Sequence, residues 1–324
     1  MRIVLDTDPG IDDALAFLYL AAHPEAELVA VGSVHGNTTA PQTAANALRL
    51  LDKLGLHHVP VAVGAHRPLA QPLETAEFVH GHDGLGGHAG PASKREPLDI
   101  SAAEQLVRVA RAHPGEITVL ALGPLTNIAI ALGIEPELPT LLKSVFVLGG
   151  GLGVPGNITA EADANFYHDP EAADQVLAAG FDLTLIGLNV TERARADEKW
   201  LQAVASLDTP RSRYASAVLA HYAKFYTEMF GEPQVTLHDP LAAAVMLDPA
   251  LAPAWRDLAC EVELNGTHTR GKLVADLRPI ADDKFIQSPI GAGRRKARVL
   301  TEVNAKDFLE RMFAVLQDPS PLHD

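Results

Sequence analysis

The chain has 324 residues, of which 47% are hydrophobic and 21% charged, a composition typical of a globular protein with one large α/β domain or two smaller ones. Its formal net charge of −15 disfavours nucleic acids and anionic membranes as partners, because a negative surface repels both. A single cysteine, Cys260, allows no intrachain disulfide, and the sequence shows neither a leader pattern nor an apolar run of membrane length, so we expect a cytoplasmic protein with a buried thiol.

The first half of the chain alternates short apolar runs with helix patterns. We expect strands at residues 2–6, 27–34, 59–64, 116–123, 144–150 and 182–188. These runs are almost continuously apolar, as strands buried on both faces are. We expect helices between them at residues 12–22, 40–55, 101–113 and 169–180. The alternation predicts an α/β fold with an open, mainly parallel, doubly wound (Rossmann-like) sheet.

The second half differs in pattern. A helical stretch covers about residues 195–247, three β-like runs follow at 259–264, 272–277 and 296–303, and a helix at 305–317 closes the chain. There are no repeats, no low-complexity tracts and no Gly/Ser linker. We therefore predict a single domain over residues 1–324, with a helical insertion at about 195–247 and additional C-terminal strands.

Unusual polar segments follow the expected strands. They are "HGN" (35–37), "GPLTN" (123–127), "GGGLGVPGN" (149–157) and "LNVT" (188–191). In open α/β folds, ligands bind in the crevice at the carboxyl ends of the strands. The sequence therefore places a ligand site at this edge of the sheet.

The segment "LDTDPGIDDALAF" (5–17) brings four carboxylates together around a Pro-Gly turn: Asp6, Asp8, Asp12 and Asp13. Helix capping explains Asp12 or Asp13, but it leaves Asp6 and Asp8 without a role. An all-oxygen cluster suits a hard divalent cation, Ca²⁺ or Mg²⁺. The segment is no EF-hand, since Phe17 occupies the twelfth position counted from Asp6. We predict metal binding and keep capping alone as the alternative.

Two tempting patterns are set aside. "GLGVPG" (151–156) matches a dinucleotide fingerprint, but Pro155 interrupts it and no helix pattern follows. "HGH" (80–82) has no cysteine nearby and is a weak zinc signal. Isolated histidines are usually structural or solvated, and we interpret four in this way: His35, His88, His168 and His221.

Three further stretches carry candidate site residues. Asn157, Asp163 and Asn165 offer hydrogen-bonding groups for a polyhydroxyl ligand, although loop and capping roles explain each of them singly. His238 and Asp239 stand directly before an apolar helix, where Asp239 alone would be a cap. Tyr222 and Tyr226, four residues apart on one helix face, form either core packing or an aromatic wall for a planar ligand.

Taken in order, these stretches resemble the inosine–uridine-type nucleoside N-ribohydrolases. The resemblance rests on "DTDPGIDDALA", "HGN", "VHGHDGLGG", "GPLTNIA", "LGGG…GNIT", "ANFYHDPEAA" and "HDPLAAA", and it extends from about residue 2 to the closing helix. It implies hydrolysis of the N-glycosidic bond of a small-molecule ribonucleoside to free base and ribose, through an oxocarbenium-like transition state. It also implies a homodimer or homotetramer, the states in which family members commonly occur.

The resemblance assigns roles to individual residues. Asp8 would ligate Ca²⁺ and act as general base on the attacking water, and Asp13, Asp239 and the backbone carbonyl of Leu122 would complete the protein ligands. The ribose hydroxyls would be held by Asp12, Asn157 and Asn165, with Asn37 near the water. His238 would face the leaving base, and His80 and Tyr226 would line the same pocket.

This chain departs from the family pattern at two positions. Asp163 stands where the family often has Glu, which puts its usual ribose contact in doubt, and Leu148 stands where Met is common. His82 is an additional candidate for the base pocket.

Two other function classes remain open on the sequence. A haloacid-dehalogenase-type phosphatase also begins with a strand followed by D-x-D, although Pro9-Gly10 fits its motif poorly. A non-catalytic, calcium-dependent nucleoside- or ribose-binding protein would bind the same ligand without turnover.

Overall fold

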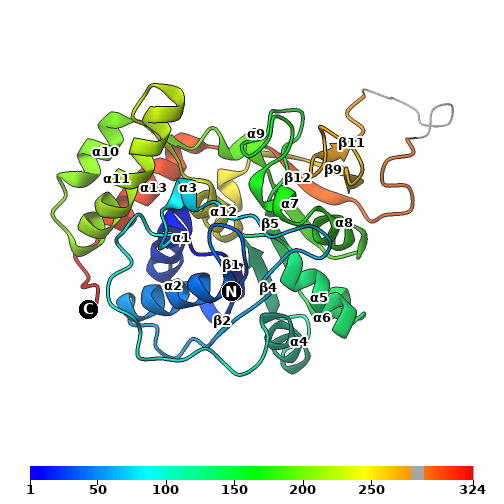
Figure 1. Ribbon diagram of the computed structural model, residues 1–324, viewed down its shortest axis with the longest axis horizontal. Helices are drawn as coiled ribbons and strands as arrows, with labels where there is room; N and C mark the ends of the chain where they lie inside the picture. The colour runs from blue at the N-terminus through cyan, green and yellow to red at the C-terminus, as the bar shows by residue number, and fades with distance from the viewer. Residues whose placement is uncertain (279–287, 324) are drawn as a thin grey trace.

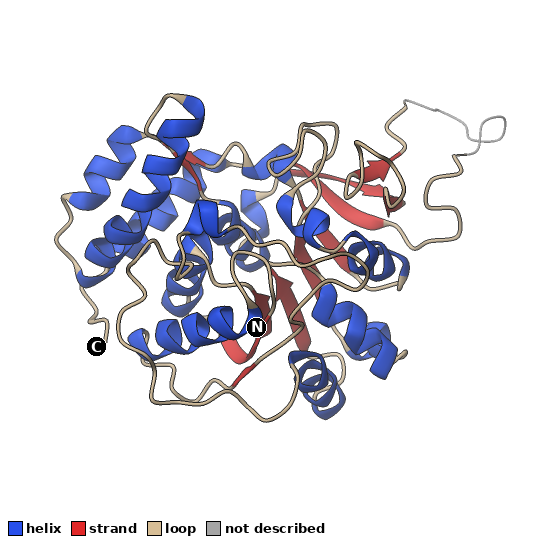
Figure 2. Ribbon diagram, in the orientation of Figure 1, coloured by secondary structure: helices blue, strands red, loops and turns tan. Residues whose placement is uncertain are grey.

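The computed structural model describes residues 1–278 and 288–323. Within them, eight strands form one sheet, with helices packed on both of its faces (Figures 1 and 2). From one edge to the other the strands are β3 (Val61–Ala62), β2 (Glu27–Ser33), β1 (Arg2–Thr7), β4 (Ile117–Ala121), β5 (Ser144–Leu148), β6 (Leu183–Ile186), β12 (Ala297–Glu302) and β9 (Ala254–Leu258). All neighbours pair in parallel except β9, which is antiparallel to β12. The predicted fold class is confirmed.

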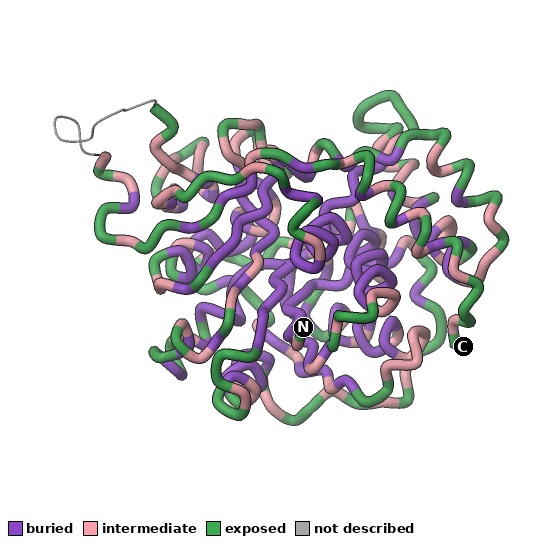
Figure 3. Tube along the Cα trace, turned by 180° about the vertical axis from the view of Figure 1, so that it is seen from behind, coloured by how far each residue is buried: buried purple, intermediate pink, exposed green. Residues whose placement is uncertain are grey.

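Successive side chains along the buried strands point to opposite faces of the sheet and contribute to two hydrophobic cores. In β1, Ile3 and Leu5 belong to one core and Val4 to the other. The first core packs α1 (Ile11–Ala22), α2 (Ala40–Lys53), α12 (His238–Leu247) and α13 (Ala305–Gln317). The second packs α4 (Ala102–Ala112), α5 (Thr126–Ile134) and α8 (Pro170–Ala178). Figure 3 shows the sheet and the helices beside it as the buried interior.

Shorter helices connect these layers. They are α3 (Glu77–His80), α6 (Leu138–Leu141), α7 (Ala164–His168), α9 (Leu188–Thr191) and a 3₁₀ turn at Pro249–Leu251. No helix of the described ranges is long and apolar enough to span a bilayer. Cys260 is buried, as expected.

The predicted helical stretch at 195–247 has a more varied structure. It contains α10 (Glu198–Ala205) and α11 (Pro210–Phe230), which are flanked by a short antiparallel pair, β7 (Arg195–Ala196) and β8 (Val235–Thr236). The stretch ends with α12, whose ten residues are all buried and which packs against α1. A helix that buries every face belongs to the core, so α12 is packed differently from α10 and α11.

The C-terminal strands also differ from the prediction. Only the run at 296–303 joins the main sheet, as β12, while β10 (Cys260–Val262) and β11 (Leu273–Ala275) form a separate antiparallel pair. The edge strand β9 was missed because its sequence, "AWRDL", has no apolar run and is mostly exposed. At the opposite edge, the run at 59–64 contributes only the two residues of β3.

Candidate active site

A cavity lies at the carboxyl ends of the central strands. The residues lining it come from most of the predicted motifs: Asp12, Asn37, His80, Leu122, Leu148, Gly149, Gly150, Asn157, Asp163, Ala164, Asn165, Ile186, Leu188, Tyr222, His238 and Asp239. The parallel strands point their carboxyl ends to one edge, and this is why segments distant in sequence meet there.

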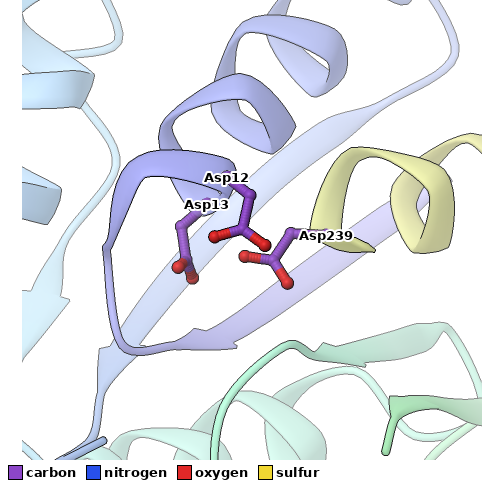
Figure 4. Close-up of side chains that lie close together, drawn as sticks. All are labelled: Asp12, Asp13 and Asp239. Carbon is purple, nitrogen blue, oxygen red and sulfur yellow. The ribbon is translucent and has the colours of Figure 1, made fainter. Parts of the chain in front are cut away.

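Three carboxylates gather beside this cavity at the ends of two helices. Asp12 and Asp13 open α1, Asp239 is the second residue of α12, and each offers an oxygen within 4.8 Å of the others (Figure 4). All three are buried. The positive ends of both helix dipoles favour negative charge here, but only partly offset the repulsion among three carboxylates.

Asp13 is held by donors on both of its oxygens. The Thr7 hydroxyl donates to Oδ1, while the Gly10 amide (2.9 Å) and Asn37 Nδ2 (3.0 Å) donate to Oδ2. The Gly10 contact is a capping interaction of α1, so Asp13 both caps the helix and belongs to the carboxylate cluster. Capping therefore accounts for one oxygen of one aspartate.

Asp8 lies in the turn between β1 and α1, against two glycines. The Asn37 amide donates to its Oδ2 at 2.7 Å. A Cβ at Gly36 would overlap Oδ2, and one at Gly123 would lie 2.6 Å from Oδ1. Both positions therefore require glycine for the backbone to come this close to the carboxylate.

Burial raises the pKa of every carboxyl in this group. The pKa of Asp12 rises to about 8, through burial and then through the charge of Asp13. The pKa values of Asp8, Asp13 and Asp239 are also raised, chiefly by burial, and those of Asp8 and Asp239 are raised further by the neighbouring aspartates. The fold therefore holds these carboxyl groups so close together that all of them are ionised only when a cation offsets their negative charge.

Asp6 is separate from this cluster. Its Oδ1 accepts a hydrogen bond from Asn127 Nδ2 at 2.7 Å, and its Oδ2 has no partner among residues 1–278 and 288–323. Burial raises its pKa to about 7. Asp6 therefore supports the start of α5 and does not line the cavity.

Another wall of the cavity carries the neutral amide side chains of Asn157 and Asn165. Asn165 Nδ2 donates to the carbonyl oxygens of Leu122 (2.6 Å) and Leu148 (3.0 Å), and Asn157 Oδ1 accepts from the Ala164 amide at 2.9 Å. Asp163 caps α7 and accepts from the Gly150 amide at 2.6 Å. With backbone donors on both oxygens, the Asp163 carboxylate orders this wall.

The third side of the cavity is formed by tyrosine and histidine side chains. His80 Nδ1 accepts from the Ile11 amide at 3.1 Å, so Nε2 carries its proton, and the ring lies 5.5 Å from that of Tyr222. His238 Nδ1 pairs with the Thr191 hydroxyl at 2.8 Å. Burial lowers the pKa of both histidines, that of His80 to about 3. With this low pKa and the contact from Ile11, the His80 ring is neutral.

Comparison with known proteins identifies this constellation. Residues 3–310 match the family described as inosine-uridine preferring nucleoside hydrolase. The chain belongs to this family, and it is a ribonucleoside hydrolase. It is 38% identical to the probable uridine nucleosidase 2 of Arabidopsis thaliana, with 83% of this chain and 84% of the relative covered. It is 37% identical to the inosine-uridine preferring nucleoside hydrolase of Crithidia fasciculata, with 86% and 88% covered.

Solved structures agree with the sequence match. A plant nucleoside hydrolase superposes with a TM-score of 0.92 at 32% identity, covering 98% of this chain and 99% of that one. A purine-preferring ribonucleoside hydrolase from Gardnerella vaginalis gives 0.87 at 30% identity, covering 98% of each chain. The phosphatase and the non-catalytic binding protein find no support.

Most of the predicted site residues of this nucleoside hydrolase line the cavity, but four do not. Asp8 and Asp13 lie beside it, in the turn after β1 and in the first turn of α1, and the other two are His82 and Tyr226. His82 is exposed, and its Nδ1 pairs with the Glu77 carboxylate at 3.0 Å. Tyr226 lies behind Tyr222, with ring centroids 4.9 Å apart. Gly81, which separates His80 from His82, has a positive φ of 80° and turns the chain outward after His80.

Several lining residues of the nucleoside hydrolase were missed. Ile186 lies at the end of the run 182–188 and Leu188 opens the segment 188–191, but neither was named as a site residue. Thr191 of that segment contacts His238 without lining the cavity. The argument that ligands bind at the carboxyl ends of strands covers this segment too. The position of this segment after a strand could therefore have identified these residues, but apolar residues at the end of an apolar strand are not recognisable as site residues from their type.

Proposed function

We propose that this hydrolase cleaves ribonucleosides with a water activated by Asp8, beside a Ca²⁺ ion held by Asp8, Asp13, Asp239 and the Leu122 carbonyl. The observation that carries this proposal is the set of buried carboxylates at the ends of α1 and α12, whose pKa values are raised above their usual range.

The donor set fits a hard cation. It consists of carboxylate and carbonyl oxygens, with no sulfur or imidazole among the proposed ligands, and this is the chemistry of Ca²⁺ or Mg²⁺. Ca²⁺ accepts more oxygen ligands in a less regular arrangement, which suits carboxylates delivered by two helices and a loop carbonyl. Such a cation lowers the pKa of a bound water.

The surroundings of Asp8 suit a residue that takes a proton from that water. The Asn37 amide and the contacts with Gly36 and Gly123 hold its carboxylate in one orientation. A general base must be presented at hydrogen-bond distance in a defined direction, so a carboxylate clamped by backbone is suited to the role.

Ribose recognition falls to Asp12, Asn157 and Asn165, which line the cavity together. Their carboxylate and amide groups can accept from and donate to vicinal hydroxyls. The nearby negative charge also favours the oxocarbenium character that the sugar acquires as the C1′–N bond breaks.

The leaving base would lie against His80, Tyr222 and His238. If Thr191 donates to Nδ1 of His238, the Nε2–H of that ring is available to the departing base, and His80 has the same tautomer. The apolar side chains of Ile186 and Leu188 complete this wall.

A substrate panel tests the proposal. Uridine and inosine come first, because relatives of this chain are named for them, and cytidine, adenosine and guanosine complete the set. Released ribose is measured before and after EGTA treatment, and protein purified without added metal is analysed for its elements. We expect one calcium per chain and loss of turnover with EGTA. Full activity in rigorously metal-free protein would refute the metal assignment.

We also propose that the enzyme acts in the cytoplasm, as a single catalytic domain and as a homodimer or homotetramer. The family resemblance supports the assembly, and the single cysteine suits a reducing compartment. Light scattering on the purified protein distinguishes these states from a monomer.

A further inference from the structure

A chain of buried hydrogen bonds runs beside the cavity, outside the set of residues that line it. His35 Nε2 lies 3.1 Å from Thr126 Oγ1, and Thr126 Oγ1 lies 2.7 Å from Asp169 Oδ2. All three residues are fully buried. They come from three segments: the loop after β2, the first turn of α5 and the N-cap of α8.

The donors in this chain are assigned from Asp169. Burial raises the pKa of this carboxyl, while the Thr126 hydroxyl and the amides of Leu69 (3.0 Å) and Ala172 (3.1 Å), which donate to it, favour its ionised form. The Thr126 hydroxyl therefore donates to Asp169, and its oxygen accepts the Nε2–H of His35. Burial, and then the proximity of His168, lowers the pKa of His35 to about 3, so the ring is neutral.

The backbone that follows His35 reaches the proposed base directly. Gly36 packs against the Asp8 carboxylate. The Asn37 amide donates to Asp8 Oδ2 at 2.7 Å, and Asn37 Nδ2 donates to Asp8 O at 3.1 Å and Asp13 Oδ2 at 3.0 Å. A shift of this turn would therefore move the Asp8 carboxylate.

We propose that His35 is a positioning residue for the hydrolytic step: through Thr126 and Asp169 its ring anchors the 35–37 turn and so orients the Asp8 carboxylate. The inference rests on the proposed role of Asp8 as base. From the sequence, His35 was interpreted only as a structural or solvated histidine, and this inference gives it a role in the reaction. A displacement of about 1 Å in such a group can cost on the order of a hundredfold in rate.

Shape-conserving variants test this role. Thr126→Val removes the hydroxyl with little change of volume, Thr126→Ser restores it, and His35→Phe keeps a ring without its donor. Thr118→Val is the matched control, since it removes a buried hydroxyl that pairs with Ser144 at 3.2 Å on strands β4 and β5. kcat and KM are measured on calcium-supplied enzyme with the best nucleoside of the panel, and thermal unfolding is followed in parallel.

We expect Thr126→Val and His35→Phe to lower kcat by about ten- to a hundredfold with little change in KM, because the ribose contacts lie on other segments. Thr126→Ser and Thr118→Val should keep kcat close to that of the unsubstituted enzyme. The double variant His35→Phe/Thr126→Val should lose no more than the worse single variant, as groups that act through one another do. ¹⁵N NMR should show the His35 ring protonated at Nε2.

Three outcomes would overturn the positioning role: an unchanged kcat in Thr126→Val, multiplying losses in the double variant, or an equal loss in Thr118→Val. These outcomes are distinct from failure of the proposed function. That failure would appear in the unsubstituted enzyme, as absence of turnover, or in Asp8→Asn, as retained turnover.

Discussion

The acidic and aromatic halves of the cavity are built from different parts of the molecule. The acidic half lies at the ends of α1 and α12; residues 11–20 of α1 and all of α12 are buried. In the aromatic half, His238 also comes from α12, but His80 and Tyr222 come from the four-residue helix α3 and from α11, near the periphery. Phe78 and Phe230 on these two helices remain 64% and 62% exposed. Figure 3 shows mostly buried residues at the centre of the molecule and a mixture of buried, intermediate and exposed residues at its periphery.

The difference has a physical basis. Carboxylates that polarise a reacting centre act most strongly where water is excluded, and only a packed core holds mutually repelling charges at fixed positions. Contacts with a neutral, planar base depend on shape and dispersion, which peripheral aromatic side chains can provide. We therefore expect the acidic half to determine whether the reaction occurs, and the aromatic half to determine which base departs and how fast.

The largest expected effect is at Asp8. Asp8→Asn keeps the size of the side chain but removes the proposed base and a proposed metal ligand, so kcat should fall by at least about 10⁴-fold on every substrate. The measurement is ribose release from uridine, inosine and p-nitrophenyl riboside. A loss confined to one of these substrates would break the assignment of Asp8 to the step that all share.

The second-largest expected effect is on the discrimination between ribose and 2′-deoxyribose in the substrate. If Asp12, Asn157 and Asn165 hold the ribose hydroxyls, a 2′-deoxynucleoside leaves buried polar groups unpaired, and kcat/KM should fall by about 10⁴-fold. Inosine and 2′-deoxyinosine are compared under identical conditions. Similar values for the two would remove the ribose role from these residues.

His238 separates the two halves most sharply. His238→Ala should lower kcat by about 10²–10⁴-fold on inosine or uridine, whose bases leave once protonated. It should lower kcat far less on p-nitrophenyl riboside, because the phenolate leaves without a proton. Equal losses on both substrate types would make His238 a structural support for Asp239, and an unaffected variant would leave His80 as the hydrogen-bond donor to the departing base.

The smallest expected effect is on stability rather than turnover. A carboxyl with a raised pKa binds more protons in the folded state, so its contribution is fully present below the unfolded value near 3.8 and is lost as pH rises through the folded value, about 8 for Asp12. In EGTA, the unfolding temperature should therefore fall between pH 5 and pH 9. Added calcium should reverse the fall, because it binds the ionised cluster. A calcium effect that does not grow with pH would contradict the cluster as the binding site.

The sequence by itself determined the parallel sheet, because strands buried on both faces must be apolar throughout, and the edge at which polar segments gather. It also indicated the chemistry, since helix capping explains only part of the carboxylates crowded into residues 8–13, and such a cluster could hold a metal ion. The resemblance to nucleoside hydrolases, confirmed by comparison, rests on the same local motifs.

Tertiary structure decided what no local pattern encodes. Only the packing of α12 against α1 brings Asp239 beside Asp12 and Asp13. The backbone turn at Gly81 directs His82 outward while His80 stays inside, although the two residues look alike in sequence. The His35–Thr126–Asp169 chain joins three segments far apart along the sequence. In each case the deciding quantity is burial or the direction of a side chain, which depends on long-range contacts that sequence spacing does not specify.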